Sequence, residues 1–286
     1  MQKIKFFLFF AVWACGTLFG DVTVHPFGSH ASYSGGFKSS DTSLGIYLDR
    51  KIGSQLLKAG YEYKDTSYTD ATYDNYQNDL IVGYSRALSP LFKLDLAAHF
   101  TISSLDQADR NQIYLAGLSY IQKERFTLGA DLAYSDYNNK SLAKNVMQIS
   151  PYFGFWYGDL LSTLGRIYVK FNYNYIDPDG ANVSLQSRYN SAEFSIRQYT
   201  KNFNNMFAYS FGKSVHLVKD KGFTVFNNNE IHTQGFILSS AYRIDAASLI
   251  KLSYIYERYD AYDPVLSASK NDVKSKRFLL SASLKF

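Results

Sequence analysis

Histidine is the side chain most often used as a catalytic base, and this chain has five, at positions His25, His30, His99, His216 and His232. Catalysis by serine with histidine requires the two within hydrogen-bond reach, together with an orienting third group. His99 shares a strand face with Asp95, but four strand residues separate them by about 13 Å, which prevents direct pairing. His25 and His30 have no companion at metal-ligand spacing. The sequence therefore predicts no enzyme, no metal site and no cofactor.

The charged residues follow a different pattern, which is strict alternation with apolar residues. Between Phe92 and Thr101 every second residue is apolar, and Lys93, Asp95 and His99 stand between them. Residues 126–135 and 166–175 alternate in the same way. Because successive side chains of a strand point to opposite faces, each segment has one apolar and one polar face. Lys or Arg would cost about 2–4 kcal/mol facing lipid at mid-depth, so the polar faces predict a wet interior.

If the apolar faces point to lipid, the polar faces point inward, and their side chains line the lumen that the strands enclose. Both signs of charge are present with a slight basic excess, which favours a narrow aqueous pore for small solutes with weak selectivity, tending toward anions. The candidate pore-lining residues are Lys58, Glu62, Asp79, Lys93, Asp95, His99, Asp131, Arg166, Lys170, Glu193, Arg197, Lys251 and Glu257.

The elements that would hold these side chains are about fourteen antiparallel strands closed into a transmembrane β-barrel, an all-β fold. Short connections alternate with mostly longer, polar ones, as in bacterial barrels, whose strand number is even. With fourteen strands, both termini lie on the side of the short turns, which is the periplasm in such proteins. The segments are 30–39, 42–50, 54–64, 73–86, 91–103, 110–121, 126–137, 145–157, 164–176, 186–199, 204–214, 230–244, 249–259 and 272–286.

Composition agrees with a barrel and excludes other classes. Aromatic residues make up 17% of the chain, and Tyr and Trp favour membrane interfaces. Past residue 20 no apolar run reaches the roughly 18 residues of a spanning helix. A soluble sandwich or ligand-binding barrel would also alternate, but it explains the aromatic ends of the apolar faces less well. The net charge of +5, or +3 without the two lysines of residues 1–20, is too small for a nucleic-acid binder.

Residues 1–20 have the pattern of a cleaved signal peptide, which leaves 21–286 as the barrel domain. Lys3 and Lys5 precede an apolar stretch, and small residues follow it up to Gly20. Cys15 leaves a second possibility open, a lipoprotein signal cleaved before that cysteine, although bulky Trp13 fits that pattern poorly. If Cys15 is removed with the leader, the mature chain has no cysteine.

The C-terminal segment carries a resemblance to a known class. Counting back from Phe286, apolar residues fall at every second position, namely Leu284, Ala282, Leu280 and Phe278. This resembles the terminal strand of bacterial outer-membrane β-barrels, porin-like proteins among them. The resemblance implies an outer-membrane location in contact with lipid, and recognition of Phe278, Leu280, Leu284 and Phe286 by the barrel-assembly machinery. No strand has an outward face that is polar or small throughout, so we expect a monomer.

Three functions remain open for such a barrel. A porin for small hydrophilic solutes is favoured. An uptake channel for hydrophobic compounds is the alternative, disfavoured because Asp21–Ser29 is too short for an N-terminal plug. A structural or adhesive barrel without a pore is the third. The longest loop, Ser214–Asn229, contains Phe223 and Val225 beside charged residues, and either folds inward as a constriction or forms an external hairpin. We expect the external hairpin.

Overall fold

The computed structural model describes residues 21–69, 75–104, 109–137, 143–160, 164–179, 187–225, 230–263 and 268–286. The leader predicted for residues 1–20, with Cys15, lies outside the described residues. Within the described ranges, no helix is long and apolar enough to cross a membrane.

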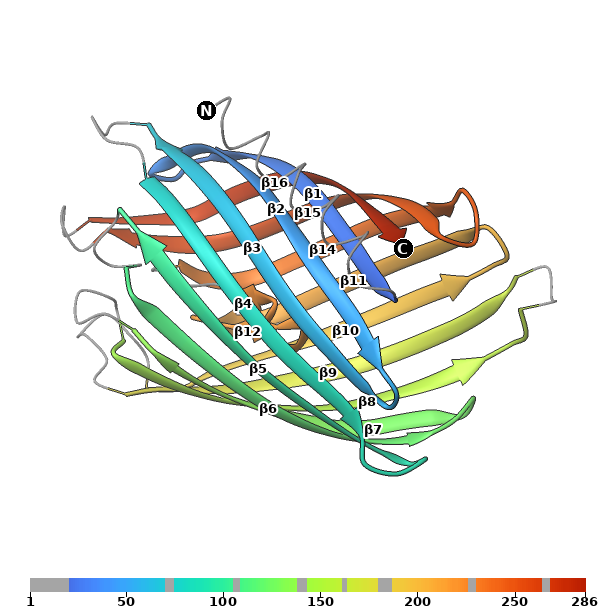
Figure 1. Ribbon diagram of the computed structural model, residues 1–286. Coiled ribbons are helices and arrows are strands. Elements are labelled where there is room, and N and C mark those ends of the chain that lie inside the picture. The colour runs from blue at the N-terminus through green and yellow to red at the C-terminus, as the bar shows by residue number, and fades with distance from the viewer. Residues whose placement is uncertain are drawn as a thin grey trace.

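Fourteen antiparallel strands form a closed barrel in which each strand pairs with its neighbours along the barrel and β16 closes onto β1 (Figure 1). This confirms the predicted fold class and strand number. A separate two-stranded piece, β12–β13, belongs to the segment between β11 and β14. The barrel strands are β1 (Val22–Ser34), β2 (Lys38–Ile52), β3 (Gln55–Tyr68), β4 (Asn75–Ala87), β5 (Phe92–Ser103), β6 (Asn111–Gln122), β7 (Phe126–Asp136), β8 (Asn145–Tyr157), β9 (Arg166–Asp179), β10 (Tyr189–Tyr199), β11 (Phe203–Ser214), β14 (Glu230–Arg243), β15 (Ser248–Asp263) and β16 (Ala268–Lys285).

The first strand differs most from the prediction, and β2, β3, β15 and β16 are each longer than predicted by a few residues at the end of the barrel where β1 joins β2. β1 begins at Val22 rather than at residue 30, and β2 begins at Lys38 rather than at residue 42. Pro26 hides the early start in the sequence, because proline has no N–H for a strand ladder. In the barrel Pro26 pairs with Ile46 of β2, while the ladder to β16 passes from Val24 directly to Phe27.

The outer face of the barrel is apolar and exposed. Large apolar side chains on most of the strands keep two-fifths or more of their surface accessible, among them Leu80, Leu96, Leu118, Leu132, Ile149, Phe171, Leu238, Leu252 and Leu280. A water-soluble protein would not expose a continuous apolar band of this size. A closed barrel with such a band satisfies its backbone internally and presents hydrocarbon to its surroundings, which is the requirement for spanning a bilayer.

The two ends of the barrel differ. β1 begins and β16 ends at the end that carries the short turns, where the N–H of Phe286 donates to the carbonyl of Val22 at 2.9 Å. At the opposite end β1 joins β2, and β3, β5, β7, β9, β11 and β15 end there, so the mostly longer connections start from that end. We call these the short-turn end and the long-loop end. That the short-turn end faces the periplasm stays a prediction.

Candidate functional site

The segment that joins β11 to β14 enters the barrel lumen. Its described residues include β12 (Val218–Lys219), a single 3-10 turn, η1 (Asp220–Gly222), and β13 (Thr224–Val225). We call residues 215–225 the inward loop. Its contacts reach the inner faces of strands from β2 to β10, so the loop crosses the lumen.

An apolar cluster at the long-loop end anchors the start of the inward loop. Val215 and Leu217 are buried against Tyr137, Val146, Ile176 and Tyr189, which come from β8 to β10 and the residue after β7. Burying two aliphatic side chains of this size contributes about 3–6 kcal/mol in total. The cluster therefore fixes the direction in which the chain leaves β11.

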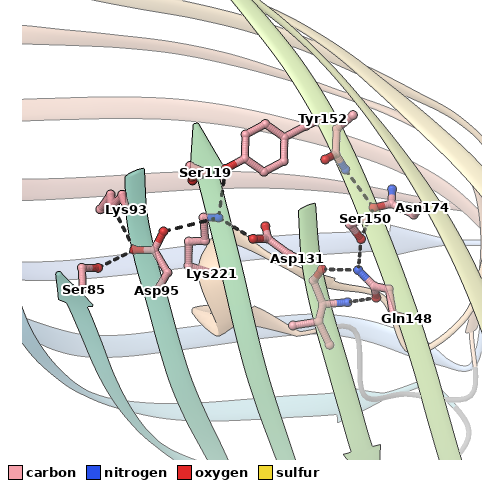
Figure 2. A network of polar contacts seen from close by, with 12 residues as sticks. Ser85, Lys93, Asp95, Ser119, Asp131, Gln148, Ser150, Tyr152, Asn174 and Lys221 are labelled. Carbon is pink, nitrogen blue, oxygen red and sulfur yellow. Dashed lines mark hydrogen bonds and ion pairs between the residues drawn. The ribbon is translucent and has the colours of Figure 1, made fainter. Parts of the chain in front are cut away.

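A single glutamine then holds β12 to the wall. The side-chain oxygen of Gln148 accepts a hydrogen bond from the N–H of Val218 at 2.9 Å, and its amide nitrogen donates to the carbonyl of Val218 at 2.8 Å. The amide of Gln148 also donates to Ser150, which donates to Asn174 (Figure 2). This pairing imitates one step of a strand ladder, so a wall side chain replaces the neighbouring strand that β12 would otherwise need. The next residue, Lys219, pairs with Glu193 of β10 at 2.7 Å.

Lys221 is the electrostatic centre of the inward loop. Its ammonium group bonds to the carboxylate of Asp131 on β7 and lies 3.6 Å from that of Asp95 on β5 (Figure 2). It also donates to the hydroxyl of Tyr152 at 3.4 Å. Burial disfavours the charged form, but the Asp131 carboxylate outweighs it and raises the pKa of Lys221 above its usual value. The lysine therefore stays charged and ties the loop to two strands at once.

His99 holds the turn that follows. Its Nδ1 lies 3.2 Å from the carbonyl oxygen of Gly222, and its Nε2 lies 2.9 Å from Asp79 on the neighbouring strand β4. Each ring nitrogen of His99 therefore has an oxygen partner of its own, one on the inward loop and one on the wall. The sequence singled out Asp95 as the carboxylate on the same face, whereas the partner of His99 is Asp79 across the ladder. Both ring nitrogens are occupied, which leaves neither to act as a base.

Small residues on the wall allow the inward loop to pack closely against it. Gly222 has φ +87°, and a Cβ there would meet the Cβ of Ala97 at 3.1 Å. A Cβ on Gly83 would meet the ring of Phe223 at 3.2 Å. Lys221 Nζ lies 3.1 Å from the Cβ position of Gly117. The wall and the loop are therefore shaped to one another, because larger side chains at these points would push the loop out.

The expected external hairpin at 214–229 is therefore wrong for its described part, which folds inward instead. The energetic reason is that Val215, Leu217 and Phe223 find apolar partners inside, while every lysine between them finds a carboxylate. The sequence held two clues. Apolar and charged residues are mixed within the loop. The inward faces of β4 to β6 carry unusually small residues such as Gly83 and Gly117.

The structure places all the predicted pore-lining residues at the strand positions that alternate with the exposed apolar ones. Asp79, Asp95, His99, Asp131 and Glu193 gather around the inward loop and bind it or support it. Lys58 pairs with Asp49 at 3.5 Å and lies 5.3 Å from the ring of Phe223. The other predicted pore-lining residues lie elsewhere on the inner wall, and they are Glu62, Lys93, Arg166, Lys170, Arg197, Lys251 and Glu257.

These remaining residues do not form one site. Lys93 pairs with Asp95 at 2.7 Å, and Glu257 lies 3.9 Å from His232. The four cations of β9, β10 and β15 lie on a part of the wall away from these pairs, and they are Arg166, Lys170, Arg197 and Lys251. Glu62 lies on β3. That the thirteen residues line a conducting pore stays a prediction.

Sequence reasoning missed a second polar network at the long-loop end. Arg277 pairs with Asp41 at 2.8 Å, and Tyr33 donates to the same carboxylate. Lys38 pairs with Glu230, which lies 3.5 Å from His232. These contacts join β1, β2, β14 and β16, where the barrel closes, so they stabilise the seam between the first and last strands. Spacing along the chain could not reveal them, because the partners are up to 236 residues apart.

Comparison with known proteins identifies the fold. No family model matches the chain, and no curated protein does either. A bacterial polysaccharide outer membrane secretin superposes with a TM-score of 0.58 at 8% identity, covering 93% of this chain and 99% of that one. The protein has the fold of a bacterial outer-membrane β-barrel. The toluene transporters TbuX of Ralstonia pickettii and TodX of P. putida each superpose with a TM-score of 0.55 at 9% identity over 95% of this chain, covering 91% and 92% of theirs.

Proposed function

We propose that the protein is an outer-membrane channel for small hydrophobic compounds, narrowed by the inward loop. The observation that carries this proposal is the inward loop itself, which occupies the lumen and brings an aromatic ring to the wall. Membrane placement rests on the exposed apolar band of the outer face. In this proposal a solute passes between the inward loop and the barrel wall.

Aromatic side chains face the lumen on both sides of the inward loop. On one side Phe27 stacks on Tyr47 at 5.0 Å, and Tyr47 meets Phe223 edge-on at 5.4 Å between ring centroids. On the other side, nearer the short-turn end, Trp156 lies 4.5 Å from Tyr168. Rings of this kind provide apolar contact area with a polar edge, which suits aromatic and other small hydrophobic solutes.

The sequence disfavoured uptake of hydrophobic compounds because it predicted no N-terminal plug. In the structure the described part of the segment between β11 and β14 crosses the lumen, and in this proposal it takes the place of a plug. The two toluene transporters that superpose on the chain support the same proposal, since they combine this barrel fold with transport of a hydrophobic compound. At 9% identity they show the fold alone, so the substrate class rests on the lumen.

A narrow pore for hydrophilic solutes is the second candidate. The charged inward residues favour it, and Lys93, Arg197 and Lys251 stand near the short-turn end, where water has access. The ion pairs between the inward loop and the wall argue against the hydrophilic pore, because they neutralise charges that would otherwise attract ions into the lumen.

Uptake by intact Gram-negative cells separates the two candidates. Cells that express the protein and cells with an empty vector are given radiolabelled toluene or radiolabelled arabinose at equal concentration. We expect toluene uptake to rise several-fold and arabinose uptake to stay at the vector level. The opposite pattern would establish the hydrophilic pore, and no change for either solute, with folded barrel present in the outer membrane, would leave only the structural role.

A further inference from the structure

The lumenal wall near the short-turn end combines aromatic rings with unpaired cations. Trp156, Tyr168 and Tyr199 lie on the inner faces of β8, β9 and β10. The centroid of Trp156 is 4.5 Å from that of Tyr168 and 5.6 Å from that of Tyr199. The guanidinium of Arg166 stacks on Trp156 at 4.4 Å from the ring centroid. Together they form a half-open aromatic surface that faces the lumen, which we call the aromatic wall.

Three cations stand beside the aromatic wall without a carboxylate of their own. Within the described ranges, Lys170, Arg197 and Lys251 make no ion pair, whereas Lys38, Lys58, Lys93, Lys219, Lys221 and Arg277 all do. Lys170 instead lies over the ring of Tyr152 at 4.3 Å. The carboxylate of Asp220 in the inward loop interacts with Lys170 and Lys251 from beyond ion-pair distance and accepts a hydrogen bond from Thr224. Asp131 and Glu193 also face Lys170 from a distance, but each is already paired with a lysine of the inward loop, and Arg166 lies 3.8 Å from Glu124. The cations without an ion pair of their own are therefore Lys170, Arg197 and Lys251, with Asp220 facing two of them.

Strand register places the cations around a shallow floor. Arg197 pairs with Tyr168 of β9, so it projects next to the aromatic wall. One row nearer the short-turn end, the inward positions run from Tyr199 through Asn204 and Ala241 to Lys251. Three strand spacings, about 14 Å, separate the backbones of β10 and β15. In the row of Lys251 the side chains between the two strands, Asn204 and Ala241, are short, and in the row of Arg197 the residues Met206, Ser239 and Ser253 follow. Both cations project into the lumen from this curved wall.

We propose that this region is a binding subsite for small aromatic carboxylates. The ring of the ligand packs on the aromatic wall, and its carboxylate lies over the floor, where Arg197 and Lys251 donate to it. Charge-assisted hydrogen bonds of this kind are the strong ones, and arginine holds a carboxylate with two parallel N–H groups. The subsite deepens the proposed function, on which its hydrophobic half rests, by adding an anionic group to the substrate class.

Fluorescence of Trp156 reports directly on this subsite. The chain has two tryptophans, at positions 13 and 156, so a full-length chain with Trp13→Phe emits from Trp156 alone. This protein, refolded in detergent micelles, is titrated with benzoate and with benzyl alcohol, its neutral counterpart. We expect benzoate to change the emission saturably and to bind at least tenfold more tightly than benzyl alcohol. Equal affinities would overturn the proposal.

The cations are tested by a double substitution with a matched control. Arg197→Gln with Lys251→Gln should weaken benzoate binding at least tenfold and leave benzyl alcohol binding within twofold. Lys93→Gln removes a lumenal lysine at the same end that is already paired with Asp95, and should change neither. A faster migration of the unheated than of the heated protein in SDS gels confirms that each variant folds. Unchanged benzoate affinity in the double variant would refute the subsite.

Three further outcomes separate the parts of the claim. If sulfate competes with benzoate at equal concentration, the site recognises charge only and the aromatic part of the proposal is wrong. If cells show no toluene uptake while benzoate binds as described, the proposed channel function fails and the subsite stands. If toluene uptake occurs and benzoate does not bind, the subsite fails alone.

Discussion

Replacing Lys221 with methionine should release the inward loop. Methionine keeps the length of the side chain and removes the ammonium group that ties the loop to Asp131 and Asp95. Asp95 keeps two other partners, Lys93 at 2.7 Å and Ser85 at 2.5 Å. Asp131 loses its ion pair and stays largely shielded from solvent, with 15% of its side chain exposed. The cost therefore falls mainly on Asp131.

The size of the effect follows from burial. Removing one partner of a fully buried ion pair costs about 3–5 kcal/mol. The Lys221 side chain is 31% exposed, so water screens part of the interaction. We take about 2 kcal/mol as the loss of docking free energy. Because 1.4 kcal/mol corresponds to a factor of ten, the ratio of docked to released loop should fall about 30-fold.

Single-channel recording in planar bilayers measures this ratio. The wild-type protein should show rare openings, and Lys221→Met should raise the open fraction about 30-fold. Lys213→Met, which removes an exposed lysine of β11 outside the loop, is the control and should resemble the wild type. Reversing the pair, with Lys221→Glu and Asp131→Lys together, should restore most of the closed behaviour. Equal open fractions in Lys221→Met and wild type would refute the view that this ion pair holds the loop in the lumen.

Four other outcomes are expected. Gly222→Ala should cost about 1–2 kcal/mol of docking, because its positive φ disfavours a side chain and Ala97 stands close, and openings should become roughly tenfold more frequent in the same recordings. Deleting residues 216–228 should give a larger, steady conductance without unfolding the barrel; conductance at the wild-type level would contradict the constriction. Leu132→Arg should destabilise the protein by about 2–4 kcal/mol in urea unfolding from lipid vesicles, with Leu132→Met near wild type, since this side chain faces lipid. Removing Phe286 should slow insertion in cells, followed by pulse-labelling, far more than refolding in detergent, and an equal slowing of both would show that the residue acts on folding rather than on recognition.

The strand pattern was readable from the sequence because a lipid-facing barrel wall imposes a period of two on every strand. In the segment from Phe92 to Thr101, and in the other alternating segments, the sequence shows which residues face lipid and which face the lumen. Pro26 hid the start of β1. A proline lacks the N–H group that a strand ladder uses, and the sequence does not show which neighbouring strand would need it.

The inward loop was harder to predict because its partners lie far along the chain. Lys221 meets Asp131 across 90 residues, and Val218 meets Gln148 across 70. Composition showed that the loop had apolar residues to bury, but it did not show whether the lumen had room for them. The small inward residues Gly83 and Gly117 make that room, and they become informative only when strand order is known.

Concentration dependence of toluene uptake tests the central claim most directly. Initial uptake rates are measured in intact cells expressing the wild-type protein, over a range of toluene concentrations, with the vector rate subtracted. A channel with apolar contact sites in its lumen predicts a rate that saturates and that benzene lowers by competition. A rate that equals the vector control at every concentration, with folded barrel in the outer membrane, would contradict the account.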